Sequence, residues 1–274
     1  MLKVISTHVF LRQRLHPGLL DALHKGGAQG IEIFAARQHF DYASRVHVKE
    51  VADWFRANPV ESFSIHMPLY SDTDMGRSGA PAVNVVHPEK SRRIDAMDEV
   101  KRALEVAEEI RIKYLILHLG EREDRWNPRT LEHAMTAIEH LKAFARPLGV
   151  QLLLENIANE VTQPQNVLEI LSIGHFKDVG LCLDVGHAHF SEGVRSTLEQ
   201  WKPQIFSTHI HDNHGMKDEH LWPGDGTIDW TEAMTELRSA PHLAGAVLEI
   251  HYQLEESPDS VSKRAAETFS KLEL

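Results

Sequence analysis

The sequence predicts an α/β protein, a single (β/α)8 barrel of the TIM type that spans residues 1–274. Three observations lead to this prediction. Eight short apolar segments alternate with longer segments of helical periodicity. The apolar segments are nearly continuous, as expected of parallel strands that are buried on both faces. The length is ordinary for one such barrel, and no low-complexity segment or Gly/Ser-rich linker divides the chain.

The predicted elements follow one another in strict alternation. The strands cover residues 4–9, 30–34, 62–66, 114–118, 150–155, 179–184, 205–210 and 246–250. The helices cover residues 16–25, 47–58, 89–111, 127–146, 164–172, 196–201, 229–238 and 260–272. Pro17 suits the first turn of the first helix, and Asp229 with Glu232 predicts a capping box at the start of the seventh. A doubly wound open sheet is the alternative, but no Gly-rich phosphate loop follows the first strand.

Composition limits the class of protein. Hydrophobic residues make up 42% of the chain and charged residues 25%, as in a typical globular protein. The one cysteine, Cys182, cannot form a disulfide within this chain, and a reducing compartment fits. No apolar run reaches the roughly 20 residues of a membrane span and no signal core is evident, so we expect a cytoplasmic location and no membrane partner. The formal net charge of −11 disfavours a surface that tracks nucleic acid.

Histidine and aspartate gather in one stretch, residues 207–230. It contains His209, His211, His214 and His220 together with Asp212, Asp218, Asp225 and Asp229. Imidazole and carboxylate groups at such density suit a divalent metal of the zinc or manganese kind. For this stretch alone, a solvated loop rich in turns is the competing interpretation. Five other histidines are expected to be ordinary surface or helix residues: His24, His39, His47, His133 and His140.

Six of the eight predicted strands end in a histidine or an acidic residue. These residues are His66, His118, Glu155, Asp184, His209 and Glu249. All strand ends of a barrel meet on one face, where barrel active sites lie. A local hydrogen bond explains one such residue, but a shared metal site explains six. Buried carboxylates and imidazoles are otherwise costly unless they are paired or bound to a cation.

The order of these motifs resembles a known superfamily over essentially the whole chain. The segments SIHMPL, LILHLG, LLLENI, LCLDVGHAH, STHIHDN, KDEHLWPGDGTIDW and VLEIH resemble the xylose-isomerase-like TIM barrels. That superfamily includes sugar and sugar-phosphate isomerases and epimerases. It also includes metal-dependent apurinic endonucleases of the endonuclease IV type, the apurinic endonuclease family 2.

The isomerase and epimerase members imply one divalent ion with four ligands. The matching positions are Glu155, Asp184, His209 and Glu249. In those members the two glutamates also move protons on opposite faces of a ketose, which makes Glu155 and Glu249 the expected catalytic pair. His187 matches a position that contacts substrate. The resemblance therefore implies an isomerase or epimerase of a sugar, a sugar phosphate or a related polyol ketone.

The endonuclease members imply three zinc ions on nine ligands. Their first set falls on His66, His118 and Glu155, their second on Glu155, Asp184, His209 and Glu249, and their third on His187, Asp218 and His220. A zinc-dependent phosphodiesterase is therefore the alternative function, and the expected cofactor is zinc or manganese, with one to three ions. Arg37 and Gln38 after the second strand are the candidate DNA-facing loop, but no clean basic stripe surrounds the barrel mouth. Nucleic acid is thus the less favoured partner.

Other positions have two interpretations. His211 shares the strand parity of His209 and is a candidate for contacting substrate or a metal ligand. Trp222 lies in a predicted mouth loop, where it either stacks on a sugar or covers the barrel rim. Glu32 and His8 point into or out of the barrel, and the sequence does not decide which.

Related barrels often form dimers or tetramers, so a homo-oligomer is compatible with the resemblance. A barrel that binds metal without catalysis is a third class, which the intact pair of glutamates disfavours.

Overall fold

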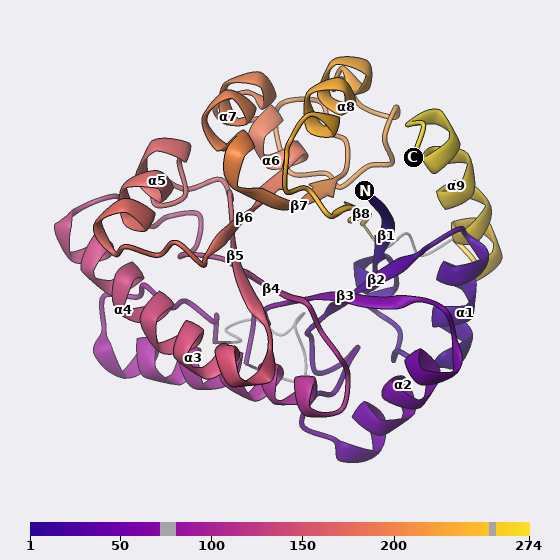
Figure 1. Ribbon diagram of the computed structural model, residues 1–274, viewed down its shortest axis with the longest axis horizontal. Helices are drawn as coiled ribbons and strands as arrows, with labels where there is room; N and C mark the ends of the chain where they lie inside the picture. The colour runs from indigo at the N-terminus through magenta and orange to yellow at the C-terminus, as the bar shows by residue number, and fades with distance from the viewer. Residues whose placement is uncertain (72–80, 252–255) are drawn as a thin grey trace.

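Eight parallel strands close into a barrel in the order β1 to β8, and helices surround it (Figure 1). The computed structural model describes residues 1–71, 81–251 and 256–274. The strands are β1 (Leu2–Ser6), β2 (Gly30–Phe34), β3 (Glu61–His66), β4 (Tyr114–Leu117), β5 (Gln151–Glu155), β6 (Gly180–Asp184), β7 (Ile205–Ile210) and β8 (Gly245–Leu248). Pairing of β1 with both β2 and β8 closes the sheet. The predicted (β/α)8 barrel is confirmed.

Helices follow the strands around the outside of the barrel in the described part of the chain. They are α1 (Pro17–Lys25), α2 (Arg45–Ala57), α3 (Lys90–Leu104), α4 (Pro128–Ala145), α5 (Pro164–Ile173), α6 (Val185–His189), α7 (Val194–Trp201), α8 (Trp230–Arg238) and α9 (Pro258–Lys271). Four short 3-10 helices accompany them: η1 (Thr7–Phe10), η2 (Glu105–Glu108), η3 (Arg146–Leu148) and η4 (Lys202–Gln204). None of the described helices is long and apolar enough to cross a membrane.

Three elements differ from the prediction by more than a shift of one or two residues. The strand predicted at 4–9 ends at Ser6, because the Ser6 hydroxyl accepts from the backbone N–H of His8 and starts η1. The long helix predicted at 89–111 divides into α3 and η2. The short helix α6 was not predicted, since five residues are too few to show a helical period. Asp184 caps α6 by accepting from the backbone N–H of His187 at 2.6 Å, and this contact places His187 at the barrel mouth.

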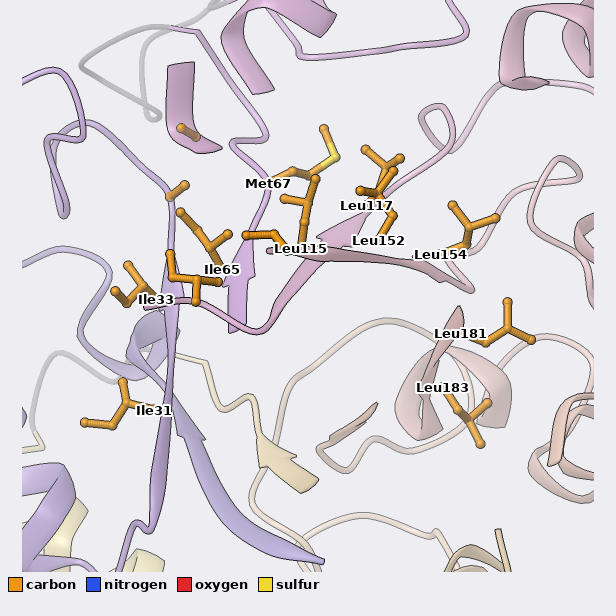
Figure 2. Close-up of a cluster of buried hydrophobic side chains, with 14 of the residues drawn as sticks. Ile31, Ile33, Ile65, Met67, Leu115, Leu117, Leu152, Leu154, Leu181 and Leu183 are labelled. Carbon is orange, nitrogen blue, oxygen red and sulfur yellow. The ribbon is translucent and has the colours of Figure 1, made fainter. Parts of the chain in front are cut away.

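The strands carry two separate apolar surfaces. On the outer surface, side chains of neighbouring strands pack against the helices, and Figure 2 shows this cluster with Ile31, Ile33, Ile65, Met67, Leu115, Leu117, Leu152, Leu154, Leu181 and Leu183. On the inner surface, a smaller cluster fills the barrel with Val4, Phe63, Tyr114, Ile116, Leu153, Cys182 and Val247. Successive strand residues point to opposite faces. The residues two positions beyond Leu153, Cys182 and Val247 therefore also point inward, toward the barrel mouth.

Candidate metal centre

The strand-end residues predicted from the sequence meet inside the barrel mouth. His66, Glu155 and Asp184 end β3, β5 and β6, and His118 and Glu249 directly follow β4 and β8. His209 lies on β7 and pairs in register with Asp184 on β6. Each of these residues except His118 is 3% exposed or less. Charged groups at this depth need partners of opposite charge or a bound cation.

Four groups of side chains bring their ligand atoms within 4.8 Å of one another in the described part of the chain, and three of them contain the predicted ligands; the fourth combines Glu155 and His209 with Cys182. One contains Glu155, Asp184, His209 and Glu249, which we call the main group. The second contains His66, His118 and Glu155, and the third contains His187, His211, Asp218 and His220. Glu155 belongs to both the main and the second group. All nine positions predicted as ligands fall within these groups, and His211 joins them.

The main group is arranged around one nitrogen of His209. Its Nδ1 lies 3.2 Å from Glu155 Oε1, 3.3 Å from Glu249 Oε2 and 3.7 Å from Asp184 Oδ2. His209 Nδ1 and Glu155 Oε1 are both buried and have no hydrogen-bond partner among the described residues. Buried polar atoms are normally satisfied. Two orphaned ligand atoms facing two further carboxylates therefore fit a divalent cation.

In the second group two imidazoles converge on one carboxylate. His118 Nε2 lies 3.1 Å from Glu155 Oε2, and His66 Nε2 lies 3.5 Å from the same oxygen. His66 Nδ1 is 2.8 Å from the carbonyl oxygen of Met67, an acceptor only. The Nδ1 proton of His66 therefore donates to that carbonyl, and Nε2 keeps the lone pair that a metal ligand needs.

The third group repeats this arrangement beside α6. His187 Nε2 and His220 Nε2 lie 3.2 Å and 3.0 Å from Asp218 Oδ2. The Nδ1 atoms of both histidines face backbone carbonyls, that of Asn156 at 2.9 Å and that of Glu249 at 2.8 Å. His187 and His220 thus also present Nε2 to a shared point. His220 adopts a left-handed backbone conformation (φ 47°), which costs a non-glycine residue energy and is typical of functional loops.

Asp212 organises the loop that carries Asp218 and His220. Its carboxylate accepts from the backbone N–H of Gly224 at 2.8 Å and from the indole N–H of Trp230 at 2.8 Å. At Gly226 a Cβ would lie 2.3 Å from Asp212 Oδ1, so only glycine fits there. Asp212 therefore shapes the loop, whereas Asp229 caps α8 as predicted.

Carboxylates and imidazoles of the site shift the pKa values of one another. Burial would raise the pKa of Glu155, but His209 and His118 together hold it well below its ordinary value. Burial would lower the pKa of His220, but Asp218 raises it to about 9. Glu155 thus remains ionised at neutral pH and attracts positive charge. Protons on the imidazoles and a divalent ion compete for the same positions.

Two predicted substrate contacts, His211 and Trp222, are buried. His211 is fully buried, its Nε2 is 3.0 Å from Asp184 Oδ1, and its ring stacks on His220 at 3.9 Å. His211 therefore belongs to the third group and connects it to Asp184 of the main group. Trp222 is 3% exposed within the hydrophobic core, and the Arg264 guanidinium lies 5.2 Å from its ring centre. Trp222 thus offers no open face for a sugar.

Sequence reasoning left Glu32 undecided and misplaced His39. Glu32 points into the barrel, where its Oε2 lies 3.2 Å from His209 Nε2. His39 and His47 were expected at ordinary surface or helix positions. His47 lies in α2, whereas His39 lies in a loop, and both side chains are fully buried. Each contacts a backbone carbonyl, that of Gln13 for His39 and that of Leu15 for His47. Such burial depends on loops packing from a distance, which the local pattern does not reveal.

A pocket of about 450 Å³ opens beside the second and third groups. Three ligand residues, His118, His187 and Asp218, line it. The lining also includes the aromatic and apolar side chains of Tyr70, Ile157 and Phe190 and the charged side chains of Glu121, Arg122 and Lys217. A larger pocket of about 720 Å³ near α2 contains none of the predicted site residues. The pocket beside the ligand groups can therefore bring a small molecule to them.

The family model described as xylose isomerase-like TIM barrel matches residues 20–272. The chain belongs to this family. Its relatives include epimerases and endonucleases, so the fold and family define an enzyme superfamily without fixing the reaction.

Individual relatives are distant. A fructoselysine 3-epimerase of Shigella flexneri is 24% identical over 255 residues, which cover 90% of this chain and 89% of that protein. A probable endonuclease 4 of Natronomonas pharaonis is 27% identical over 166 residues, 53% and 58% of the two chains. The chain spans about half the length of the first curated relatives that it matches. An uncharacterised protein of Methanocaldococcus jannaschii, for example, is 27% identical over a region that covers 51% of this chain and 51% of that protein.

Solved structures of low sequence identity share the fold. A crystal structure of the IolI protein with a bound zinc atom gives a TM-score of 0.82 at 18% identity, over 99% of this chain and 98% of that one. A D-tagatose 3-epimerase-like protein gives 0.80 at 21% identity, over 100% and 96%. At these identities the likeness establishes the barrel fold.

Proposed function

We propose that this protein is a divalent-metal-dependent isomerase or epimerase of a sugar, a sugar phosphate or a related polyol ketone. The observation that carries the proposal is the main group, in which Glu155 and Glu249 approach the same His209 nitrogen at 3.2 Å and 3.3 Å. Two buried glutamates that face one point suit proton transfer to and from a carbon between them. Asp184 and His209 complete the four-ligand set.

The chain supplies the parts that such a reaction needs. A divalent ion, zinc or manganese, supplies Lewis-acid polarisation of a substrate carbonyl when it is bound. Glu155, ionised because the imidazoles lower its pKa, removes a proton beside that carbonyl, and Glu249 returns one on the other face. The burial of both residues excludes bulk water from the transferred proton.

The pocket suits a small substrate that carries a negative charge. Its volume of about 450 Å³ lies in the usual range for small-molecule sites. Arg122 forms no ion pair with any residue in the described ranges, so its guanidinium is available to a phosphate or carboxylate. Lys217 adds a second positive charge and is itself only loosely paired, 3.4 Å from Glu219. These two cations favour a phosphorylated sugar, whereas Glu121 and Asp218 of the same lining oppose an anion.

The relatives support the proposal. The fructoselysine 3-epimerase aligns over nine-tenths of this chain, and the zinc-containing IolI structure shares the barrel. A cytoplasmic location and a homo-oligomer remain predictions from the sequence.

A second candidate is a zinc-dependent phosphodiesterase of the apurinic endonuclease kind. The presence of all three ligand groups, two of which share Glu155, favours it, and probable endonucleases 4 are among the relatives. The charges oppose it. Arg37, the candidate DNA-facing residue, is held by Glu99 at 2.6 Å, and Arg125 is held by Glu160 at 2.9 Å. Neither guanidinium is free for a phosphate backbone.

Two assays on the metal-loaded protein separate these functions. A panel of ketoses and ketose phosphates is incubated in deuterated water, and deuterium at the carbon next to the carbonyl is followed by NMR. An isomerase or epimerase incorporates deuterium only with its substrate. The same preparation is given abasic duplex DNA, which a phosphodiesterase nicks in a salt-dependent manner. Nicking without exchange contradicts the proposal, and neither activity would indicate a binding protein.

A further inference from the structure

Glu32 is a fully buried carboxylate that reaches the main group from the opposite part of the barrel. It lies on β2, while its partner His209 lies on β7, 177 residues along the chain. Glu32 Oε2 is 3.2 Å from His209 Nε2 and accepts from the Ser64 hydroxyl at 2.7 Å. Both Glu32 and His209 are 0% exposed. No solvent screens this contact.

We propose that Glu32 is a positioning residue that selects which nitrogen of His209 faces the metal. A neutral imidazole carries one N–H, and an ionised carboxylate can only accept. The proton therefore resides on His209 Nε2, next to Glu32, and the lone pair resides on Nδ1. That Nδ1 is the atom that faces Glu155, Glu249 and Asp184. The negative charge of Glu32 also makes the imidazole a stronger donor to a cation.

Other roles for Glu32 fit the structure less well. It belongs to none of the ligand groups among the described residues, so it is not expected to bind the ion directly. It does not line the substrate pocket and is fully buried, so it does not reach a bound molecule from there. Ser64 alone is a weak partner for a buried carboxylate. The inference rests on the metal site of the proposed function, and not on the reaction.

Metal affinity tests the inference directly. We would measure dissociation constants for zinc by competition with a chromophoric chelator, for the wild type and for the variants Glu32→Leu and Glu32→Gln. Leucine removes the acceptor, and we expect about 10- to 100-fold weaker binding. Glutamine keeps an acceptor oxygen but loses the charge, and a smaller loss of several-fold is expected. Ser64→Ala leaves the carboxylate in place, so its effect should be the smallest.

A matched control uses another buried carboxylate. Glu99 is 3% exposed and pairs with Arg37 on the outside of the barrel. Glu99→Gln should leave zinc affinity within about twofold, although it loosens the fold. Cobalt-substituted protein gives a second readout, because its visible absorption reports the ligand field. The spectrum should change in Glu32→Leu and stay unchanged in Glu99→Gln.

Each outcome decides the matter. Should Glu32→Leu fail to fold, Glu32→Gln decides, and a folded Glu32→Gln that binds zinc as tightly as the wild type overturns the proposal. An unchanged affinity with a reduced kcat also overturns it, because Glu32 would then act on the substrate. A wild type that binds no divalent ion overturns both this inference and the proposed function. A wild type that binds zinc while Glu32→Gln binds equally well overturns the inference alone.

Discussion

Two layers of side chains inside the barrel lie one strand repeat apart and have opposite chemistry. The lower layer is the inner apolar cluster, with Leu153 on β5 and Val247 on β8. The upper layer is the set of ligand groups, with Glu155 two residues after Leu153 and Glu249 two residues after Val247. The backbone places both layers in the same way. The residue type alone makes one a packed core and the other a site for cations.

The comparison teaches how this barrel separates stability from function. In the lower layer, burial of apolar surface stabilises the fold. In the upper layer, burial leaves His209 Nδ1 and Glu155 Oε1 without hydrogen bonds, a state that costs stability. The packed layer beneath holds these unfavourable atoms in place. Substitutions in the lower layer should therefore change the free energy of unfolding, and substitutions in the upper layer should change metal binding and proton exchange.

The largest effect should follow from changing Glu155, because it belongs to two ligand groups and is the proposed base. Glu155→Gln keeps the side-chain shape but removes the charge. We expect it to lower the rate of substrate proton exchange by about 10³-fold and to reduce the number of bound ions. Deuterium exchange and elemental analysis measure the two effects. A variant that retains wild-type exchange would show that the proton passes through another residue.

The matching change in the lower layer is Leu153→Ala on the same strand. Leu153 is fully buried, so its truncation should lower the free energy of unfolding by about 2–5 kcal/mol. The number of metal ions per folded chain should not change. Urea unfolding gives the first quantity and elemental analysis the second. Loss of metal from a folded Leu153→Ala protein would mean that the two layers are not separable.

Two histidines, one outside the upper layer and one within it, sharpen the comparison through pH. Burial lowers the pKa of His39 to about 4. Burial also acts to lower the pKa of His220, but the larger opposing effect of Asp218 raises it to about 9. For His39 the pKa in the folded protein lies below the ordinary value of 6.5. The contribution of the neutral imidazole to the free energy of unfolding is therefore complete above pH 6.5 and is lost as the pH falls toward 4. Between pH 7.5 and 5 the wild type should lose about 2 kcal/mol through this residue.

The variant His39→Asn keeps a donor near the Gln13 carbonyl but does not titrate. Urea unfolding at both pH values should show a shallower loss in His39→Asn than in the wild type. Equal slopes in the two proteins would contradict the assignment. For His220 the sign is opposite in chelator-treated protein, since a raised pKa gives stability that is lost as the pH rises through 9.

The smallest effect concerns the pocket rim. Arg122→Ala should raise KM for a phosphorylated substrate about 10-fold, while kcat and the KM of the neutral analogue stay unchanged. Arg125→Ala is the control, because Arg125 is paired with Glu160 and lies outside the pocket lining. Steady-state kinetics with both substrates distinguishes them. Equal effects of the two changes, or an equal loss for the neutral sugar, would remove the argument for an anionic substrate.

Much of this arrangement could be predicted from the sequence because strand parity is a local property. Apolar runs that end in Glu155, Asp184 or Glu249 gave both the strands and the side of the barrel that these residues face. Glu32 could not be placed, because every residue of GIEIF is buried and no alternation marks the inner face. A register shift in the pairing of β2 with β3 lies next to it, between Ile31 and Glu32.

Other errors arose from contacts between distant segments. Trp222 resembles a rim residue until Arg264 of α9 covers its ring. His39 resembles a surface residue until the loop at Gln13 packs against it. The helix α6 is too short to show a helical period in the sequence, yet it positions His187. These features depend on tertiary packing, which propensity and spacing do not contain.

The central claim is that the upper layer binds divalent metal, and metal content per chain tests it most directly. Protein purified without chelator, then reconstituted with zinc or manganese, would be measured by elemental analysis beside Glu155→Gln. The account predicts one to three ions per wild-type chain and fewer in the variant. One ion points to the main group and the isomerase chemistry, and three ions strengthen the phosphodiesterase alternative. A folded wild-type protein that retains no ion after reconstitution would contradict the account.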